Sequence, residues 1–201
     1  MSTQILKLLV FGFILPMGPG SPAAETNRTT RPATWATAMQ ADGLSNFYKV
    51  SDRLYRSAQP SRDGMSKLKE FGIKTVVNLR SFHSDRKNLG NAALAYEHLY
   101  MKAWHPEEKE VVRFLRLVAD ESRGPVLVHC QHGADRTGLM CAVYRVAVQG
   151  WTKEEALTEM RDGGYNFHSI WRNLPSWFNK LDIEKIRKAV GITPPKPTPA
   201  L

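Results

Sequence analysis

Short apolar runs and amphipathic stretches alternate through the middle of the chain. Residues 75–79 (Thr-Val-Val-Asn-Leu) form a largely β-branched run of strand length, and residues 126–128 (Val-Leu-Val) form another. Such runs are typical of strands that are buried on both faces of a sheet. Between them, apolar residues recur at helical spacing over residues 107–119, with acidic residues in the first turn, where the helix dipole favours them. Strands that alternate with helices predict an α/β domain with a central, mostly parallel sheet flanked by helices.

The flanking sequence predicts further elements of both kinds and a helical C-terminal part. Thr152 and Glu155 form a capping box, in which each side chain satisfies a backbone N–H at a helix start. The other predicted elements are strands at 53–56 and 97–101, and helices between Pro60 and Gly72, at 137–148, from Thr152 to Gly163 and within 169–190.

The length of 201 residues suits one domain with a hydrophobic core. We expect ordered structure to begin near Phe47 and assign residues 46–190 to this domain. Residues 25–45 are rich in Thr, Ala, Asn and Arg without a clear period, and we interpret them as a linker or loosely attached arm. Residues 191–201 form a proline-rich tail, which cannot pack as a regular element.

The N-terminus has the order of a secretory signal peptide. Lys7 precedes the apolar stretch Leu8–Leu15, Pro16 and several glycines follow, and Ala23-Ala24 supply small residues for cleavage. The apolar stretch is shorter than the roughly 20 residues that span a bilayer. We therefore expect residues 1–24 to be removed and the protein to be exported, to the periplasm, with no membrane span after processing. An uncleaved anchor or a mistaken start codon is the alternative.

The chain is basic, with a formal net charge of +9. Such a charge favours anionic partners in general, and a solvated basic surface is the ordinary explanation for it. The Lys and Arg residues are scattered along the chain rather than concentrated in runs, so no nucleic-acid partner is expected. Hydrophobic residues at 42% and charged residues at 23% are the balance of an ordinary globular protein.

Residues 126–138 carry the chemistry of the chain. A buried strand is predicted to end at His129, a short loop containing Gly133 follows, and a helix is predicted to begin near Thr137. A loop between a strand and a helix N-terminus can aim successive backbone N–H groups at one point, where the positive end of the helix dipole also lies. The segment therefore predicts an anion-binding site.

Cys130 stands at the base of this predicted site. The N–H groups and the dipole stabilise its thiolate, which is the nucleophilic form. Arg136 follows six residues later and can offer two parallel N–H bonds to phosphate oxygens. This set suits phosphoryl transfer, in which positioning and charge stabilisation do most of the catalysis. Thr137 can hydrogen-bond the thiolate and help to expel it from an intermediate.

The motif His129-Cys130-x5-Arg136-Thr137-Gly138 resembles the active-site loop of the protein tyrosine and dual-specificity phosphatase superfamily. A bare C-x5-R motif is weak, but the preceding strand, His129 and the Thr-Gly continuation make it specific. The wider resemblance is to the bacterial exported subgroup of the TpbA type and covers roughly residues 50–165, through the segments 54–57, 72–80 and 124–151.

The resemblance implies a dual-specificity-phosphatase fold and a cysteine-dependent phosphatase that hydrolyses phosphomonoesters. Phosphorylated proteins, above all on tyrosine and also on serine or threonine, would be its substrates, together with small phosphomonoesters. It implies Cys130 as nucleophile, Arg136 as phosphate clamp, His129 and Thr137 as supporting residues, and no metal or other cofactor. The residues expected to bind the substrate are Gln131, His132, Gly133, Ala134, Asp135 and Arg136.

The match departs from the family at the general acid. The family uses an Asp on a separate loop, ahead of the helix that precedes the active-site strand. Residues 101–110 of this chain contain no Asp. We assign Glu108 as the candidate, while Glu107, His105 and the more distant Asp85 stay open; an acidic first turn of a helix is the ordinary explanation for the two glutamates. Without an acid, alkyl phosphates would turn over slowly and aryl phosphates would be less affected.

Other function classes remain open from sequence. An inositol or lipid phosphate phosphatase is one, although Asp135 and the absence of Lys from the loop weigh against a heavily phosphorylated substrate. A catalytically weak phosphate-binding module would not need both Cys130 and Arg136, and a rhodanese-like sulfur-transfer enzyme lacks the Arg-Thr-Gly continuation. We interpret Cys141 as a core residue, with a disulfide to Cys130 as a minor hypothesis. The sequence does not fix the oligomeric state.

Overall fold

The computed structural model describes residues 31–193. The predicted signal peptide at 1–24 and residues 194–201 of the predicted tail lie outside the described residues, so both stay predictions. Within residues 31–193, no helix combines the length and apolar character needed to cross a membrane.

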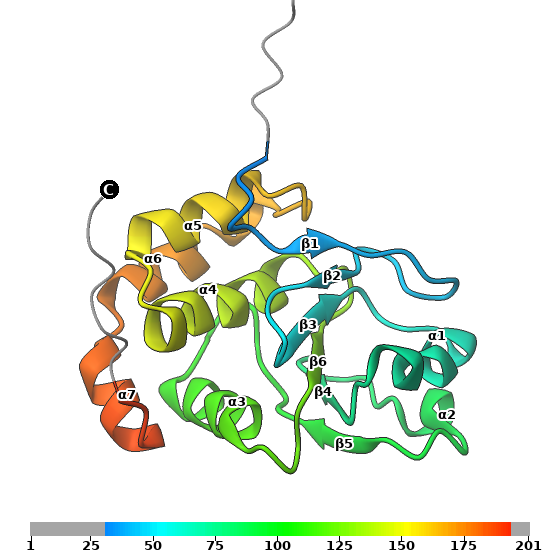
Figure 1. Cartoon of the computed structure of the whole chain (residues 1–201). Helices are drawn as coiled ribbons and strands as arrows, with labels where there is room; N and C mark the ends of the chain where they lie inside the picture. Colours follow the sequence, from blue (N-terminus) through cyan, green and yellow to red (C-terminus); the bar gives the residue numbers. More distant parts are fainter. Residues whose placement is uncertain (1–30, 194–201) are drawn as a thin grey trace, which may run out of the picture. The chain divides into compact units, whose positions relative to one another are not determined.

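A six-stranded sheet forms the centre of the fold, in the order β1-β2-β3-β6-β4-β5 (Figure 1). The four strands from β3 to β5 in this order pair in parallel, and β1 and β2 join β3 in antiparallel pairing at one edge. The predicted central, mostly parallel sheet is therefore confirmed. The strands are β1 Thr37–Ala38, β2 Tyr48–Lys49, β3 Leu54–Ser57, β4 Thr75–Asn78, β5 Ala95–His98 and β6 Val126–His129.

Helices cover both faces of this sheet (Figure 1). The predicted helical C-terminal part is confirmed, and residues of α4 to α7 belong to the larger of the two hydrophobic cores. The helical elements are α1 Arg62–Lys67, the 3-10 helix η1 Leu68–Phe71, α2 Arg86–Leu89, α3 Glu108–Ala119, α4 Asp135–Gln149, α5 Lys153–Asp162, the 3-10 helix η2 Ser169–Trp171, α6 Asn173–Lys180 and α7 Ile183–Val190.

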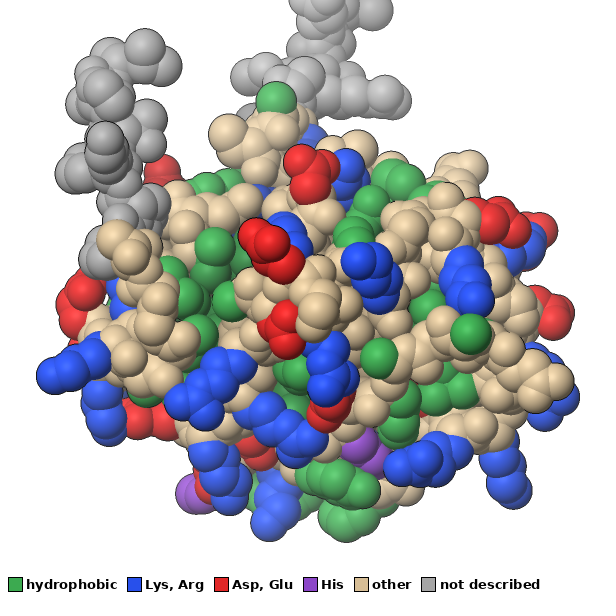
Figure 2. All heavy atoms as spheres, turned by 60° about the horizontal axis from the view of Figure 1, so that its bottom comes forward, with side chains coloured by type: hydrophobic (Ala, Val, Ile, Leu, Met, Phe, Trp, Pro, Cys, Tyr) green, Lys and Arg blue, Asp and Glu red, His purple; other side chains and the backbone are tan. Residues whose placement is uncertain are grey.

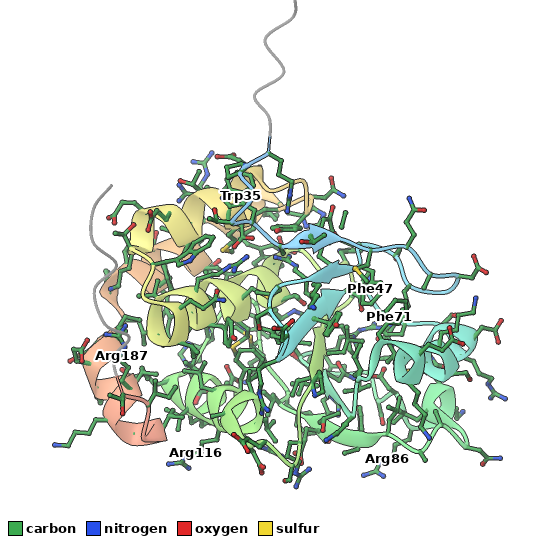
Figure 3. All side chains as sticks on the ribbon, in the orientation of Figure 1. Trp35, Phe47, Phe71, Arg86, Arg116 and Arg187 are labelled. Carbon is green, nitrogen blue, oxygen red and sulfur yellow. The ribbon has the colours of Figure 1, made fainter. Side chains whose placement is uncertain are left out.

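Alternate strand residues face opposite sides, because successive side chains of a strand point to opposite faces. Val77 and Val128 pack in the large core with α3 and α4, whereas Val76 and Leu127 pack in a smaller core with α1 and η1. All four are fully buried, which explains why β4 and β6 read as continuous apolar runs in the sequence. The smaller core also holds Phe47 and Phe71, whose rings meet edge to face with centroids 5.0 Å apart (Figure 3).

The N-terminal boundary of the ordered structure differs from the prediction. Ala36 is buried at 2% exposure, and Thr37–Ala38 pair with β2 as strand β1, so ordered structure begins before Phe47. The backbone N–H of Ala36 donates to Glu159 Oε1 on α5 at 2.7 Å. Residues 31–45 are therefore packed against the domain, through contacts that the local composition does not reveal.

Glu159 joins this N-terminal segment to the centre of the helical layer. Arg145 of α4 donates to both oxygens of Glu159, at 2.7 Å each, and Tyr165 donates to Oε1 at 3.0 Å. Arg145 and Glu159 are 2% and 4% exposed. Burial acts to raise the pKa of Glu159, but the hydrogen bonds and charge of Arg145 outweigh it and hold the pKa below its ordinary value. A buried carboxylate satisfied in this way stays ionised.

Two predicted element boundaries differ in the structure, and one predicted helix start is confirmed. Strand β5 covers 95–98 rather than 97–101, since its register with β4 aligns Thr75 with Ala95 and Asn78 with His98. Leu99 and Met101 are buried apolar residues beyond the strand, and they extend the apolar pattern past the strand end. Helix α4 begins at Asp135, two residues before the predicted start. The predicted capping box of α5 is present.

Helix α3 begins with a second capping box, between Glu107 and Glu110. Glu110 Oε2 accepts a hydrogen bond from the Glu107 N–H at 3.1 Å, and Glu110 is 7% exposed. Burial raises the pKa of Glu110 to about 7, although the hydrogen bond from Glu107 opposes the rise. This carboxyl group is therefore half protonated near neutral pH.

We expect Glu110→Gln to stabilise the protein at alkaline pH. The folded state keeps a proton on Glu110 up to about pH 7, whereas the ordinary pKa of a glutamate side chain is 4.5. Because the folded state binds more protons across this window, stability falls as pH rises through it. Glutamine stays neutral and can still accept the capping bond.

In urea titrations at pH 8 the free energy of unfolding of the variant should exceed that of the parent by on the order of 1 kcal/mol. This value is smaller than the whole pKa shift implies, because water reaches part of the carboxyl group. Near pH 4 the two proteins should have the same free energy of unfolding. A parent that stays equally or more stable at pH 8 would contradict the assignment.

Candidate active site

The predicted chemical segment lies at the C-terminal end of β6, beside the C-terminal ends of β3 and β4. Cys130 follows β6 directly and is 1% exposed, and α4 begins at Asp135. We call residues 130–136 the Cys130 loop. Its position between a buried strand and the N-terminus of a long buried helix is the one predicted from the sequence.

The backbone carbonyls of the Cys130 loop face the surrounding scaffold. Those of Gln131, His132 and Gly133 each accept a hydrogen bond from outside the loop. The donors are Gln59 N–H at 3.1 Å, Asn46 Nδ2 at 2.9 Å and Arg56 Nη2 at 2.6 Å, respectively. In a planar trans peptide the C=O and the following N–H point in opposite directions. The N–H groups that follow these three carbonyls therefore face the inside of the loop, where an anion can bind them.

Glycine is required at position 133. Its φ angle is +69°, in the left-handed region, and a Cβ atom built there would lie 2.5 Å from the carbonyl group of Ser57 at the end of β3. Any side chain at this position would strain the backbone and displace the loop from the sheet.

Buried Arg56 supports the same turn. It is 1% exposed, donates to the Gly133 carbonyl, and lies with its guanidinium carbon 3.5 Å from the ring centroid of Tyr165. No sequence pattern singles out Arg56, because both of its partners lie far along the chain from it.

Arg136 reaches across the C-terminal edge of the sheet. Its Nη1 lies 3.4 Å from the carbonyl oxygens of Leu79 and Met101. These distances are long for N–H···O hydrogen bonds, which are usually about 2.7–3.2 Å. The guanidinium group is thus held in place loosely and can turn its donors to a tetrahedral anion.

Thr137 follows Arg136 and is fully buried. Its Oγ1 has no hydrogen-bond partner among residues 31–193. A buried hydroxyl without a partner is costly in an inert core, so this atom stands out as a group suited to a transient partner.

A buried, hydrogen-bonded His–Asp pair precedes the loop. His129 Nε2 donates to Asp85 Oδ2 at 2.7 Å, and both side chains are fully buried. Gln59 Nε2 donates to Asp85 Oδ1 at 2.6 Å, and Arg80 in turn donates to Gln59. Burial acts to raise the pKa of Asp85, but the hydrogen bond and charge of His129, with the bond from Gln59, hold the pKa below its ordinary value. Asp85, an open candidate for the general acid, is thus an ionised carboxylate committed to His129.

The other acid candidates lie around the start of α3. Glu108 accepts from Lys185 Nζ of α7 at 2.7 Å and is exposed in this pair. Glu107 pairs with Lys109 at 2.6 Å, and the hydrogen bond from Lys109 lowers the pKa of Glu107. His105 is exposed on the turn that precedes α3. Glu108, the candidate assigned from the sequence, is thus directed toward Lys185 of α7.

Asp135 and His132 face a second loop rather than solvent alone. Asp135 Oδ1 accepts from the backbone N–H of His168 at 2.9 Å, and Oδ2 accepts from His168 Nδ1 at 2.9 Å. The rings of His132 and His168 have centroids 5.1 Å apart. No sequence pattern points to His168, because it lies 33 residues from Asp135 on an irregular segment.

Cys141 is a core thiol of α4. It is 3% exposed, both cysteines are free, and burial raises the pKa of Cys141 to about 11. A thiol that holds its proton so strongly is a poor nucleophile, which agrees with the prediction of a core residue.

Known proteins resemble this chain in sequence and in fold. A protein-family model described as "DSP-PTPase phosphatase fused to NAD+ Kinase" matches residues 33–172. The dual specificity protein phosphatase TpbA of Pseudomonas aeruginosa PAO1 is 40% identical over 189 residues, which cover 94% of this chain and 84% of TpbA. This chain belongs to the dual-specificity phosphatase family. It is a cysteine-dependent phosphatase that hydrolyses phosphomonoesters, so the predicted family and enzyme class are confirmed.

Solved structures agree with this assignment. The crystal structure of P. aeruginosa TpbA superposes with a TM-score of 0.72 at 38% identity, and covers 81% of this phosphatase and 99% of TpbA. The core catalytic domain of the PP-IP phosphatase Siw14 from S. cerevisiae gives a TM-score of 0.67 at 20% identity, and covers 76% of this phosphatase and 94% of that domain. The second likeness shows a shared fold, and the predicted dual-specificity-phosphatase-like fold is confirmed.

Proposed function

We propose that this phosphatase removes phosphate from phosphotyrosine in proteins, with Cys130 as nucleophile and Arg136 as phosphate clamp. The observation that carries the proposal is the orientation of the Cys130 loop, whose carbonyls are turned to the scaffold and whose N–H groups face inward above a buried cysteine. A cysteine-to-serine variant of P. aeruginosa TpbA, at 37% identity to this chain, has been crystallised in complex with phosphotyrosine, which supports the choice of substrate.

The reaction runs in two displacements on phosphorus. Cys130 Sγ attacks the phosphorus atom, an S–P bond forms, and the P–O bond to the phenolic oxygen breaks, after which that oxygen takes a proton. Water then attacks the phosphocysteine, the S–P bond breaks, and inorganic phosphate leaves with the thiolate restored. Arg136 and the loop N–H groups hold the equatorial oxygens in both steps. Thr137 Oγ1, buried without a partner among residues 31–193, donates to the departing sulfur.

Tyrosine phosphate suits the acid groups that the structure offers. Asp85 is committed to His129, and Glu108 is paired with Lys185, so neither is poised as a strong proton donor. A phenolic oxygen is a far better leaving group than an alkyl oxygen and needs less protonation in the transition state. The site therefore favours aryl phosphates over phosphoserine and phosphothreonine.

The surface charge gives limited support for a larger anionic substrate. On the face shown in Figure 2, Lys and Arg side chains are spread over the whole width with Asp and Glu among them. An inositol polyphosphate would instead call for basic residues converging on the loop, whose own charged side chains are Asp135 and Arg136.

Phosphate release tests the proposal directly. The reduced full-length protein, in EDTA, should hydrolyse a phosphotyrosine peptide with a kcat/KM at least roughly 100-fold above that for the matching phosphoserine peptide, because the alkyl ester lacks the leaving-group advantage. Faster release from an inositol pyrophosphate than from the phosphotyrosine peptide would overturn the substrate assignment but leave the chemistry intact.

The proton donor is tested by Glu108→Gln. Because Glu108 is directed toward Lys185, we expect the variant to change kcat on phosphotyrosine and phosphoserine peptides by less than about threefold, whereas loss of a general acid costs roughly 100-fold or more. Glu121→Gln, at another exposed acid, is the matched control. A large loss confined to the phosphoserine peptide would instead establish Glu108 as the acid.

A further inference from the structure

Two histidines and a buried carboxylate meet where the Cys130 loop contacts the segment that carries His168. His132 and Asp135 belong to the loop, and His168 comes from the segment between α5 and η2. One potential ligand atom from each residue lies within 4.8 Å of the other two. We propose that these three side chains form a binding site for a divalent transition-metal ion, with Zn²⁺ as the first candidate.

The donor set suits such an ion. Zinc binds imidazole nitrogen at about 2.0–2.1 Å and carboxylate oxygen at about 2.0–2.2 Å, in a roughly tetrahedral arrangement, and three protein ligands with one open position are common. Neighbouring ligand atoms in that geometry lie about 3.3 Å apart. His168 Nδ1 and Asp135 Oδ2 are already 2.9 Å apart as a hydrogen-bonded pair, and a bound Zn²⁺ takes the place of the proton between them, which is released to solvent.

The carboxylate is oriented before any ion arrives. Asp135 is 6% exposed, and its Oδ1 is held by the backbone N–H of His168 at 2.9 Å. The other oxygen remains directed at the histidine ring. Fixing of a ligand by a neighbouring backbone group is the arrangement that supports metal ligands in proteins.

The two imidazoles can close on the ion without rearranging the fold. Both His132 and His168 are exposed, and they line a hollow of about 580 Å³ that also borders Asn46 and Tyr48. The ligand atom of His132 already lies within 4.8 Å of those of the other two residues, so a small rotation of its side chain is all that closing the site requires. The hollow leaves the fourth position open to water or to an oxygen of a bound molecule.

The site is distinct from the catalytic thiol in its chemistry. Its ligands are nitrogen and oxygen atoms, whereas zinc bound at Cys130 would be held by sulfur. The proposal therefore goes beyond the phosphatase reaction, whose two displacements are carried by Cys130, Arg136 and the loop N–H groups. Because two ligands belong to the Cys130 loop, an ion bound here ties that loop to the segment that carries His168 and adds positive charge beside it.

The test measures Zn²⁺ binding by calorimetry to the untagged full-length Cys130→Ser variant, which removes the competing thiolate and makes the result independent of turnover. We expect one equivalent to bind. His132→Ala and His168→Ala in the same background should each weaken binding by roughly tenfold or more, since one of three ligands is lost. His105→Ala, which removes an exposed histidine elsewhere, should leave the affinity unchanged.

Circular dichroism and thermal melting confirm that each variant is folded. Because the His132 side chain is exposed, its removal should not disturb the folding of the core, and a loss of Zn²⁺ binding in this variant then reports on the site itself. Absence of Zn²⁺ binding to the Cys130→Ser protein, or an affinity that survives both histidine replacements, would overturn the proposal. Neither result bears on phosphate release by the parent enzyme, so the two proposals fail separately.

Discussion

Replacement of Cys130 by serine is expected to reduce phosphate release from a phosphotyrosine peptide by a factor on the order of 10⁴ or more. The thiolate is the nucleophilic form of cysteine, and a serine hydroxyl stays protonated at neutral pH and has no adjacent general base in this site. Cys130 is buried at the end of β6, and serine is close to it in size, so the fold should remain. Stopped assays with the reduced proteins measure the change.

Binding of an oxyanion shows whether the Cys130→Ser variant has lost only its nucleophile or the whole phosphate-binding site. The Cys130→Ser protein keeps Arg136 and the loop N–H groups, so it should still bind tungstate, a tetrahedral oxyanion, with an affinity within about tenfold of the parent's. Cys141→Ala is the matched control, since Cys141 is the other buried thiol of the same region. It should keep most of the activity and lose stability only by about 1 kcal/mol. Full activity of the Cys130→Ser variant would exclude a mechanism in which Cys130 is the nucleophile.

The predictable part of this protein is local in sequence. Strand β6, the Cys130 loop and α4 are contiguous, and each has its own pattern: an apolar run, a glycine-containing loop and a long apolar helix. The backbone of such a segment is dictated by its own residues, since Gly133 alone permits the turn against β3. For this reason the residue pattern of this one segment is enough to place the chemistry.

The contacts that sequence patterns missed are distant in sequence. Asp85 and His129 are 44 residues apart, Arg56 and Gly133 are 77 apart, and the Ala36 N–H meets Glu159 across 123 positions. Periodicity reports which face of an element is buried, but not which polar group meets another across the sheet. These polar contacts are buried, so each must be satisfied by a particular partner that only the packed structure identifies.

Asp85 shows most clearly what the structure reveals and the sequence pattern does not. The sequence raised it only as a distant candidate for proton transfer. In the structure it is fully buried and bonds to His129, the residue before the nucleophile. The ring's other nitrogen, Nδ1, lies 3.1 Å from the carbonyl oxygen of Cys130. The carboxylate thus positions the backbone that carries Cys130, and we interpret it as a positioning residue rather than a proton donor.

Asp85→Asn is expected to lower kcat on phosphotyrosine by roughly 10- to 100-fold, with a smaller change in KM. Asparagine keeps the shape but loses the charge that holds His129, and small displacements of a nucleophile cost rates of this order. Titration of the active fraction with vanadate distinguishes slow turnover per site from a loss of folded protein. Asp162→Asn, at an exposed acid at the end of α5, is the control, and its kcat and KM should equal those of the parent.

The same variant changes the acid stability of the fold. Because the pKa of Asp85 is below its ordinary value of 3.8 when folded, the hydrogen bonds to its carboxylate stabilise the native state above that pH. That contribution is lost as pH falls through the folded pKa. The parent should therefore exceed Asp85→Asn in unfolding free energy at pH 7, and the gap should narrow steadily below about pH 4. A kcat within twofold of the parent, or a stability gap that is constant from pH 7 to pH 2, would show that the Asp85 carboxylate does not position His129 in its ionised form.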